Sequence, residues 1–371
     1  MNVELAIDYV GLMGQGVAHD TEGNIYFVPG ALPGDRILAR SESTKKYRDA
    51  ELVEILAPSP DRITPECAFF KECGGCDWLD WKYPAQLKAK ETVLRHVLER
   101  GAWMPDQFLP TLAADAQFGY RNRIQLRSDG KRLGFYKRRS HDIVDIESCS
   151  VAHPKLNEAL GELRTELAGT HGQQKVELAV QPDGSLVRLD NQPHAAAGFA
   201  QVHDAQNEKL KAQVVELVKR AGGESVLELF AGNGNFTLAY AEAVKEIFAI
   251  DLSPVALAQA RAGFGGKKSP RIAFVEARVD AKLVRRLPSD FRNRYDTLLL
   301  DPPRAGAEGC LEPLIHDGLK TVIYVSCSPV AFSKDVQCLK EKFRFEQVQI
   351  VDMFPHTRHI EFVAYFSRLP C

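Results

Sequence analysis

The 371-residue chain has no strong excess of charge of either sign: its formal net charge is −2, which gives no argument for a nucleic-acid partner. No apolar run approaches the ~18 residues that a membrane-spanning helix needs. The first residues lack a basic stretch followed by an apolar one. Internal repeats and low-complexity segments are also missing. We therefore expect a soluble, cytoplasmic protein without membrane association and, at this length, two or three domains.

The chain has eight cysteines, which are unevenly placed. In a long chain without a secretion signal, metal ligation or catalysis explains them better than disulfides. The first half holds Cys67, Cys73, Cys76 and Cys149, and the intervening Gly74-Gly75 allows a tight turn between the second and third. Zinc and an iron–sulfur cluster both accept four thiolates. Because metal sites often use two short pairs, the lone fourth cysteine favours an iron–sulfur cluster, with zinc as the alternative.

Residues 1–60 read as a small all-β domain. Short β-prone runs alternate with turn signals such as Pro33-Gly34-Asp35, which predicts a compact barrel of the oligonucleotide-binding type. Its basic loop at residues 43–48 would face a nucleic acid, and a solvated hairpin loop is the alternative. Prolines after residue 57 indicate a linker to the next domain.

The next region, residues 61–198, contains one helix and one basic hairpin. Apolar residues at helical spacing between Pro84 and Gly101 predict an amphipathic helix over 84–100 that packs on another domain. The stretch 118–139 is rich in arginine, lysine and aromatic residues, and Asp129-Gly130 marks a hairpin turn. Such a hairpin can contact phosphates and stack on unpaired bases, although a solvated charged face explains the same residues.

From about residue 199 the pattern becomes an alternation of strands and helices, typical of a parallel α/β sheet. The final two runs leave no room for a crossover helix and should close the sheet in antiparallel fashion. The predicted strands are Val226–Phe230, Ile247–Asp251, Ile272–Val275, Thr297–Leu300, Val322–Val325, Phe345–Met353 and Ile360–Phe366.

A glycine turn between the first of these strands and a helix predicts a nucleotide site. Gly232 and Gly234 let backbone approach a ligand closely, and Asp251 ends the next strand, where it can accept hydrogen bonds from ribose. Thr237 stands where a dinucleotide fingerprint has its third glycine. Together with Glu228 ahead of the turn, this favours a methyltransferase over a dehydrogenase, and a purely structural turn is the alternative.

Two further motifs lie at the carboxyl ends of strands, where open α/β sheets bind ligands. Asp301-Pro302-Pro303-Arg304 forms a rigid extended loop. In amino-group methyltransferases an aromatic residue follows such an Asp-Pro-Pro, so Arg304 counts against that chemistry. Cys327 ends the next strand before Pro329, at the start of a helix that would favour its thiolate.

A thiolate at Cys327 and a carboxylate at Glu361 suit substitution at carbon 5 of uracil. Addition of the thiolate to carbon 6 makes carbon 5 nucleophilic, and a base must later remove the carbon-5 proton. A small core cysteine and a surface strand carboxylate are the alternatives. This pairing, placed behind the glycine turn, predicts methyl transfer from S-adenosylmethionine.

The chain resembles the RNA uracil-5 methyltransferases that carry a TRAM domain and a 4Fe-4S cluster, the bacterial 23S ribosomal RNA enzymes in particular. The resemblance covers nearly the full length. It is carried by the four-cysteine set, Gly119-Tyr120-Arg121-Asn122-Arg123, Phe199-Ala200-Gln201-Val202, the glycine turn, Asp301 to Ala307, Ser326-Cys327-Ser328-Pro329, and Asp352 to Thr357 with His359-Ile360-Glu361.

The resemblance implies three domains: a TRAM β-barrel over 1–60, a small central α+β iron–sulfur domain over 61–198, and a class I, Rossmann-like methyltransferase domain over 199–371. Cys327 would be the nucleophile and Glu361 the base. The four first-half cysteines would hold the 4Fe-4S cluster. The residues expected to bind S-adenosylmethionine or frame the uracil are Gln201, Phe230, Gly232, Gly234, Asn235, Asp251 and Asp301.

The implied product is 5-methyluridine in structured RNA, and we expect 23S rRNA as the substrate of a monomeric enzyme. The same chemistry on tRNA is the first alternative. An amino-group methyltransferase and a non-catalytic RNA-binding protein are more distant ones. The chain departs from the family pattern at Ser328, Ala331 and Lys334, which usually are asparagine, threonine and arginine, and at Asp251, often glutamate.

Overall fold

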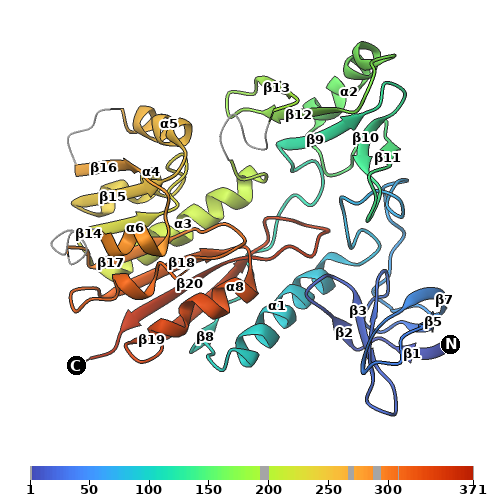
Figure 1. Cartoon of the computed structure of the whole chain (residues 1–371), viewed down its shortest axis with the longest axis horizontal. Coiled ribbons are helices and arrows are strands. Elements are labelled where there is room, and N and C mark those ends of the chain that lie inside the picture. Colours follow the sequence, from blue (N-terminus) through green and yellow to red (C-terminus); the bar gives the residue numbers. More distant parts are fainter. Residues whose placement is uncertain (1, 193–199, 266–270, 287–293, 308, 371) are drawn as a thin grey trace. The chain divides into compact units, whose positions relative to one another are not determined.

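The computed structural model describes residues 2–192, 200–265, 271–286, 294–307 and 309–370 of the chain (Figure 1). The chain divides into two compact units. Unit 1 comprises Met1–Val93, Asp115–Gln192 and Phe354–His359, and unit 2 comprises Leu94–Ala114, Pro193–Met353 and Ile360–Cys371. Each unit is thus made of segments that are distant in the sequence.

The N-terminal part of unit 1 is rich in β-structure, as expected. Two small sheets, with strand orders β1-β5-β7 and β2-β3-β4-β6, enclose one hydrophobic core that includes Ile7, Tyr26 and Ile37. The buried carboxylate of Asp35 closes this core by accepting hydrogen bonds from the Arg62 guanidinium and the Ser59 N–H. The strands are β1 (Asn2–Ala6), β2 (Tyr9–Val10), β3 (Gly16–His19), β4 (Ile25–Val28), β5 (Arg36–Arg40), β6 (Tyr47–Asp49) and β7 (Glu51–Ala57).

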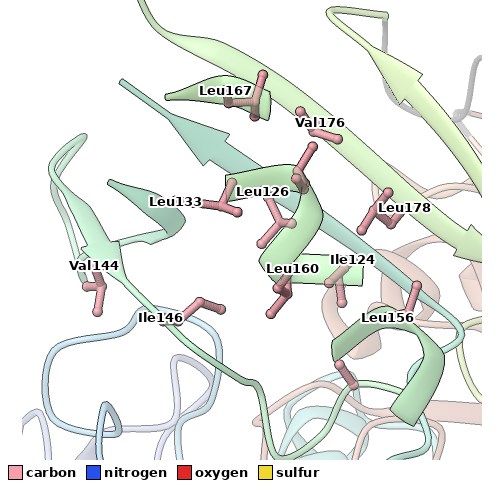
Figure 2. Close-up of a cluster of buried hydrophobic side chains, with 12 residues drawn as sticks. Ile124, Leu126, Leu133, Val144, Ile146, Leu156, Leu160, Leu167, Val176 and Leu178 are labelled. Atoms are coloured by element: carbon pink, nitrogen blue, oxygen red, sulfur yellow. The ribbon is translucent and has the colours of Figure 1, made fainter. Parts of the chain in front are cut away.

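A second sheet in unit 1 has the strand order β11-β10-β9-β12-β13. Side chains alternate in burial along β9, so Ile124 and Leu126 reach a core that helix α2 covers with leucines such as Leu156 and Leu160 (Figure 2). The predicted hairpin at Asp129-Gly130 is confirmed by the β9–β10 pairing. The elements are β9 (Arg123–Ser128), β10 (Leu133–Tyr136), β11 (Ile143–Asp145), α2 (Pro154–Leu167), β12 (Gln174–Val180) and β13 (Leu186–Asp190).

The predicted helix at 84–100 is also confirmed, as α1 (Tyr83–Arg100). The division between the units falls within it, after Val93. Its C-terminal end lies in unit 2, where the carbonyl oxygens of Gly101 and Ala102 accept hydrogen bonds from Gln337 and Lys340. The domain boundaries at 60 and 198 stay predictions.

Unit 2 is built on an eight-stranded sheet with the order β16-β15-β14-β17-β18-β20-β19-β8. Strands β14 to β18 are parallel, and β20 pairs antiparallel with both β18 and β19, which confirms the predicted α/β sheet and its antiparallel closure. The strands are β8 (Gln107–Phe108), β14 (Ser225–Leu229), β15 (Glu246–Asp251), β16 (Arg271–Glu276), β17 (Thr297–Leu300), β18 (Thr321–Ser326), β19 (Phe343–Val351) and β20 (Glu361–Arg368).

Helices cover both faces of this sheet (Figure 1). On β20, Phe362 contacts Phe332 of α8, whereas Tyr365 of the opposite face lies under Arg220 of α3. The helices are α3 (Asp204–Ala221), α4 (Thr237–Tyr240), α5 (Pro254–Phe264), α6 (Ala281–Arg286) and α8 (Pro329–Asp335), with short 3₁₀ turns η1 (Ala241–Ala243), η2 (Glu312–Leu314) and η3 (Val336–Leu339). Within the described residues, no helix combines the length and apolar character needed to cross a membrane.

Candidate active site

The glycine turn follows β14 and is held by both conformation and hydrogen bonds. Gly232 and Gly234 have φ angles of 56° and 81°, in the region where other residues are strained. A Cβ on Gly232 would meet no heavy atom within 4 Å, so space lies open beside it. Asp251 accepts the Gly232 N–H at 2.8 Å and the Ser253 N–H at 2.8 Å. Each carboxylate oxygen keeps a lone pair that a ribose hydroxyl can use.

Glu228 is an internal support of this turn. It is buried, and its carboxyl accepts hydrogen bonds from the hydroxyls of Thr237 (2.6 Å) and Tyr240 (2.7 Å) on α4. Burial raises the pKa of Glu228 to about 7, against the two hydrogen bonds that lower it. The acid that favoured a methyltransferase in the sequence therefore fixes the helix after the turn.

The remaining residues expected at the cofactor have different surroundings. Asn235 exchanges two side-chain hydrogen bonds of 2.9 Å with Asn207 of α3, which fixes its orientation. Phe230 has a left-handed φ of 62° and is half-buried, whereas Gln201 is buried. Phe199, from the same motif as Gln201, lies outside the described residues.

Cys327, Glu361, Asp301 and Arg304 share one electrostatic environment at the end of β17 and β18. Burial, followed by the carboxylates of Glu361 and Asp301, raises the pKa of the Cys327 thiol to about 12, and the Arg304 guanidinium opposes them. Burial also raises the pKa of Glu361 well above its usual value, with Asp301 adding to it and Arg304 opposing it. Burial, then the charge of Glu228, raises the pKa of Asp301 to about 7.

These shifts correct one expectation. We expected the helix after Cys327 to favour the thiolate, but the unliganded site favours the neutral thiol. The helix α8 begins at Pro329 as predicted, with the Ser328 hydroxyl capping the Ala331 N–H, yet it spans only seven residues. Its field is outweighed by burial and by two nearby carboxyl groups. Glu361 is 4% exposed, so it is not a surface strand carboxylate.

The loop that follows Asp301 is fixed by a residue that the sequence did not single out. Asp335, at the end of α8, accepts hydrogen bonds from the Ala307 N–H (2.7 Å) and the Tyr324 hydroxyl (2.6 Å). A Cβ on Gly306, whose φ is 90°, would lie 2.5 Å from the Asp335 carboxylate. The Asp-Pro-Pro-Arg loop, β18 and α8 thus meet at one carboxylate.

The four first-half cysteines gather around one cavity of about 70 Å³ in unit 1, together with Arg121. Burial raises the pKa of the Cys76 thiol to about 12, and the Arg121 guanidinium opposes this shift. Burial likewise raises the pKa of Cys73 and Cys149. Among the described residues, no three or more His, Cys, Asp or Glu side chains are grouped closely enough to hold a single metal ion.

Several basic residues of the hairpin contact other residues of unit 1 and so support its fold. The side chain of Arg123 is 10% exposed and pairs with Glu177, whereas Arg132 pairs with Asp129 in the turn. Arg121 lines the cysteine cavity. The exposed basic residues of the stretch include Lys131, Lys137 and Arg139.

A solved structure shares this fold over nearly the whole chain. The crystal structure of Pyrococcus abyssi tRNA (uracil-54, C5)-methyltransferase in complex with S-adenosyl-L-homocysteine superposes with a TM-score of 0.74, at 23% identity, over 98% of this chain and 100% of that one. This likeness shows an α/β methyltransferase fold joined to a β-rich N-terminal region.

Sequence relatives define the family. A family model for tRNA (Uracil-5-)-methyltransferase matches residues 191–369. An uncharacterized RNA methyltransferase of Nitrosomonas europaea is 32% identical over 99% of this chain and 97% of its own. The 23S rRNA (uracil(1939)-C(5))-methyltransferase RlmD of Thiobacillus denitrificans is 32% identical over 98% of both chains. The chain belongs to the RNA uracil-5 methyltransferase family and is an RNA methyltransferase.

Proposed function

We propose that this enzyme transfers a methyl group from S-adenosylmethionine to carbon 5 of a uridine in 23S rRNA, with Cys327 as nucleophile and Glu361 as base. One observation carries the proposal: the buried carboxyl of Glu361 raises the pKa of the Cys327 thiol, and Asp301 and Arg304 act on the pKa of both groups. Full-length similarity to a 23S rRNA enzyme supports the choice of RNA. A tRNA uridine is the second candidate, because the family model and the solved relative are named for tRNA.

The reaction begins with the sulfur of Cys327 forming a bond to carbon 6 of uracil, while the electrons of the ring double bond move onto the carbonyl oxygen. Carbon 5 then takes the methyl carbon from the sulfonium, whose electron pair stays on the leaving sulfur. Glu361 removes the carbon-5 proton, the ring double bond re-forms, and the thiolate leaves carbon 6.

The charges of the site suit this order of reaction steps. With a pKa of about 12, Cys327 is mostly a neutral thiol near neutral pH, so it must lose its proton to solvent before its sulfur adds to the ring. A positively charged sulfonium acts in the same direction as Arg304, which lowers the pKa of both Cys327 and Glu361. Binding of the methyl donor would therefore favour the thiolate and the carboxylate that the two steps need.

We propose that Gln201, Phe230, Gly232, Gly234, Asn235, Asp251 and Asp301 bind the methyl donor or frame the uracil. The open space beside Gly232 supports a ligand at the turn, and Asp251 lies against it. The N-terminal β-rich region would act as an RNA-binding TRAM domain, with the exposed side chains of Lys45, Lys46 and Tyr47 toward the RNA. We further propose a monomer that acts in the cytoplasm.

We also propose that Cys67, Cys73, Cys76 and Cys149 hold a 4Fe-4S cluster with a structural role. Four thiols around one cavity, with a cation beside them, fit a group that needs four thiolates and carries negative charge. Zinc needs four sulfurs at about 2.3 Å from one ion, a tighter grouping than the described side chains form. Iron and sulfide analysis of the purified protein tests this, with Cys149→Ser expected to lose iron and Cys338→Ser to keep it. Stoichiometric zinc without iron would overturn it.

Methyl incorporation into 23S rRNA and tRNA transcripts tests the main proposal. Wild type should label 23S rRNA, Cys327→Ala should label nothing, and Glu361→Gln should accumulate a covalent protein–RNA adduct on denaturing gels. Turnover by Cys327→Ala would defeat the covalent mechanism. Loss of 5-methyluridine from tRNA instead of 23S rRNA in a deletion strain would assign the other substrate.

A further inference from the structure

The loop that leads to Glu361 belongs to unit 1, although Glu361 itself belongs to unit 2. The loop Phe354–His359 connects β19 to β20, and only Ile360 separates it from Glu361. Within unit 1 the loop is hydrogen-bonded to the segment that follows Cys76. The position of this loop therefore affects the position of Glu361, the first residue of β20.

The Asp77 clasp, made of Asp77 and Trp78 with His356 and Arg358, joins the two segments. The His356 carbonyl oxygen accepts the N–H groups of Asp77 (2.9 Å) and Trp78 (3.0 Å). In return, the Asp77 carboxylate accepts the Arg358 N–H at 3.0 Å and its guanidinium at 2.9 Å. The Asp77 side chain is 11% exposed, so solvent screens this ion pair less than a surface pair.

Two buried side chains of α1 fix the same loop. Gln86 donates to the Trp78 carbonyl oxygen at 2.9 Å and accepts the His356 N–H at 2.9 Å, so it contacts both sides of the Asp77 clasp. Lys90 donates to the Phe354 carbonyl oxygen at 2.9 Å. His356 has a φ of 63°, a strained conformation for a residue with a Cβ, and it persists because these contacts fix its backbone.

We infer that Asp77 is a positioning residue for Glu361, acting through Arg358 and the loop Phe354–His359. This inference rests on the proposed function, in which Glu361 removes the carbon-5 proton. Proton removal needs the carboxylate within hydrogen-bond reach of carbon 5, whereas the sulfur bond forms at Cys327, which directly follows β18 in unit 2. Loosening the Asp77 clasp should therefore slow adduct breakdown more than adduct formation.

Asp77 is also linked directly to the four-cysteine set of unit 1. Cys76 precedes Asp77 by one peptide bond, and the Cys76 carbonyl oxygen accepts a hydrogen bond from Arg138, which also contacts the Asp77 carboxylate at 3.4 Å. A centre that fixes Cys76 thus fixes the start of the Asp77 clasp.

Single-turnover kinetics with separate readouts for methyl transfer and product release tests the inference. Asp77→Ala should keep its iron and form the covalent adduct at the wild-type rate, but release methylated RNA about tenfold more slowly, as loss of a charged hydrogen bond predicts. The adduct should then accumulate on denaturing gels. Asp80→Asn is the matched control, because Asp80 lies three residues on and pairs with Arg62 instead of the loop.

The outcomes separate the inference from the proposed function. If Glu361→Gln traps the adduct and Asp77→Ala releases product at the wild-type rate, the inference is wrong and the mechanism stands. If Glu361→Gln traps nothing, the mechanism itself fails. If Asp77→Ala loses iron, Arg358→Ala replaces it in the test, because this substitution alters only the loop side of the Asp77 clasp. The same slow release of methylated RNA is expected from Arg358→Ala. Wild-type release by Arg358→Ala would then overturn the inference.

Discussion

The Asp335 carboxylate accepts a hydrogen bond of 2.7 Å from the Ala307 N–H, and so joins the helix that follows Cys327 to the loop that follows Asp301. The same oxygen accepts the Tyr324 hydroxyl of β18. One carboxylate therefore holds together the two chain segments that bring the proposed nucleophile and the Asp301 loop to the end of the sheet.

This arrangement predicts that Asp335→Ala lowers methyl transfer by roughly 10- to 100-fold, because a buried N–H and a hydroxyl lose an acceptor that carries charge. Asp335→Asn should retain most activity, since the amide oxygen can accept both donors. Methyl incorporation measures activity, and thermal unfolding shows whether the fold survives. Lys334→Ala, at an exposed neighbouring position, is the control. Full activity of Asp335→Ala would show that the hydrogen bonds of Asp335 are not needed to position the site.

The reactivity of Cys327 should depend steeply on pH. With its pKa raised to about 12, its thiolate fraction, and with it the rate of alkylation by iodoacetamide, should rise about tenfold per pH unit from pH 7 to 10. Mass spectrometry of the peptide that contains Cys327 measures this rate. In urea the same peptide should level off above about pH 9, as an ordinary thiol does.

Removing the neighbouring carboxylate should move this profile in a known direction. Glu361→Gln takes away a negative charge that raises the pKa of Cys327, so alkylation at pH 8 should become faster. The alkylation rate should stay below that of a fully exposed thiol, because burial, which this substitution leaves in place, is the largest cause of the raised pKa of Cys327. A profile that levels off below pH 9 in the folded wild type would contradict the buried, carboxylate-flanked thiol.

Regular elements were predictable from the sequence because they leave a local pattern. Apolar runs predicted the parallel strands, Asp129-Gly130 predicted the hairpin, and the helical spacing of apolar residues predicted α1. Strand β8 was not predicted, because a strand of two residues shows no periodicity in the sequence. It joins the sheet through pairing with β19, which is distant in the sequence.

The candidate site was predictable where chemistry depends on residue type, and less so where it depends on long-range contacts. Cys327 and Glu361 share one electrostatic environment, which the proposed uracil chemistry needs. The direction of the Cys327 pKa shift depends on burial and on Asp301, which no local pattern reveals. The roles of Asp335 and Asp77 rest on hydrogen bonds to partners far along the chain, such as Arg358, and these leave no sequence signal.

Glu228 should make stability depend on pH. Its pKa is about 7 in the folded protein and 4.5 in an unfolded reference, so the folded state binds more protons between these values. The resulting stabilisation is complete below pH 4.5 and is lost as pH rises through 7, by at most about 3 kcal/mol. Urea unfolding of Glu228→Gln, whose amide oxygen can still accept Thr237 and Tyr240, should lack this component. Parallel pH profiles for the two proteins would contradict the raised pKa.

The two glycines of the turn should respond differently to alanine. A Cβ on Gly234 would lie 3.0 Å from the Ala260 Cβ and 3.2 Å from the Leu238 Cγ, at a φ of +81°. Strain and overpacking together should lower the free energy of unfolding of Gly234→Ala by about 2–4 kcal/mol. Gly232→Ala adds a methyl group to open space at a φ of +56°, so only the backbone cost of about 1–2 kcal/mol is expected.

Binding of the methyl donor should show the complementary effect. The new methyl group of Gly232→Ala would stand where the proposed ligand approaches the backbone, so calorimetry should find S-adenosylmethionine binding weakened by at least tenfold, or about 1.4 kcal/mol. Gly234→Ala, whose methyl group points into α5 and α4, should bind the donor with a smaller loss when it is folded at low temperature. If Gly232→Ala binds with wild-type affinity, the donor does not lie against this glycine, and the open space beside it has another use.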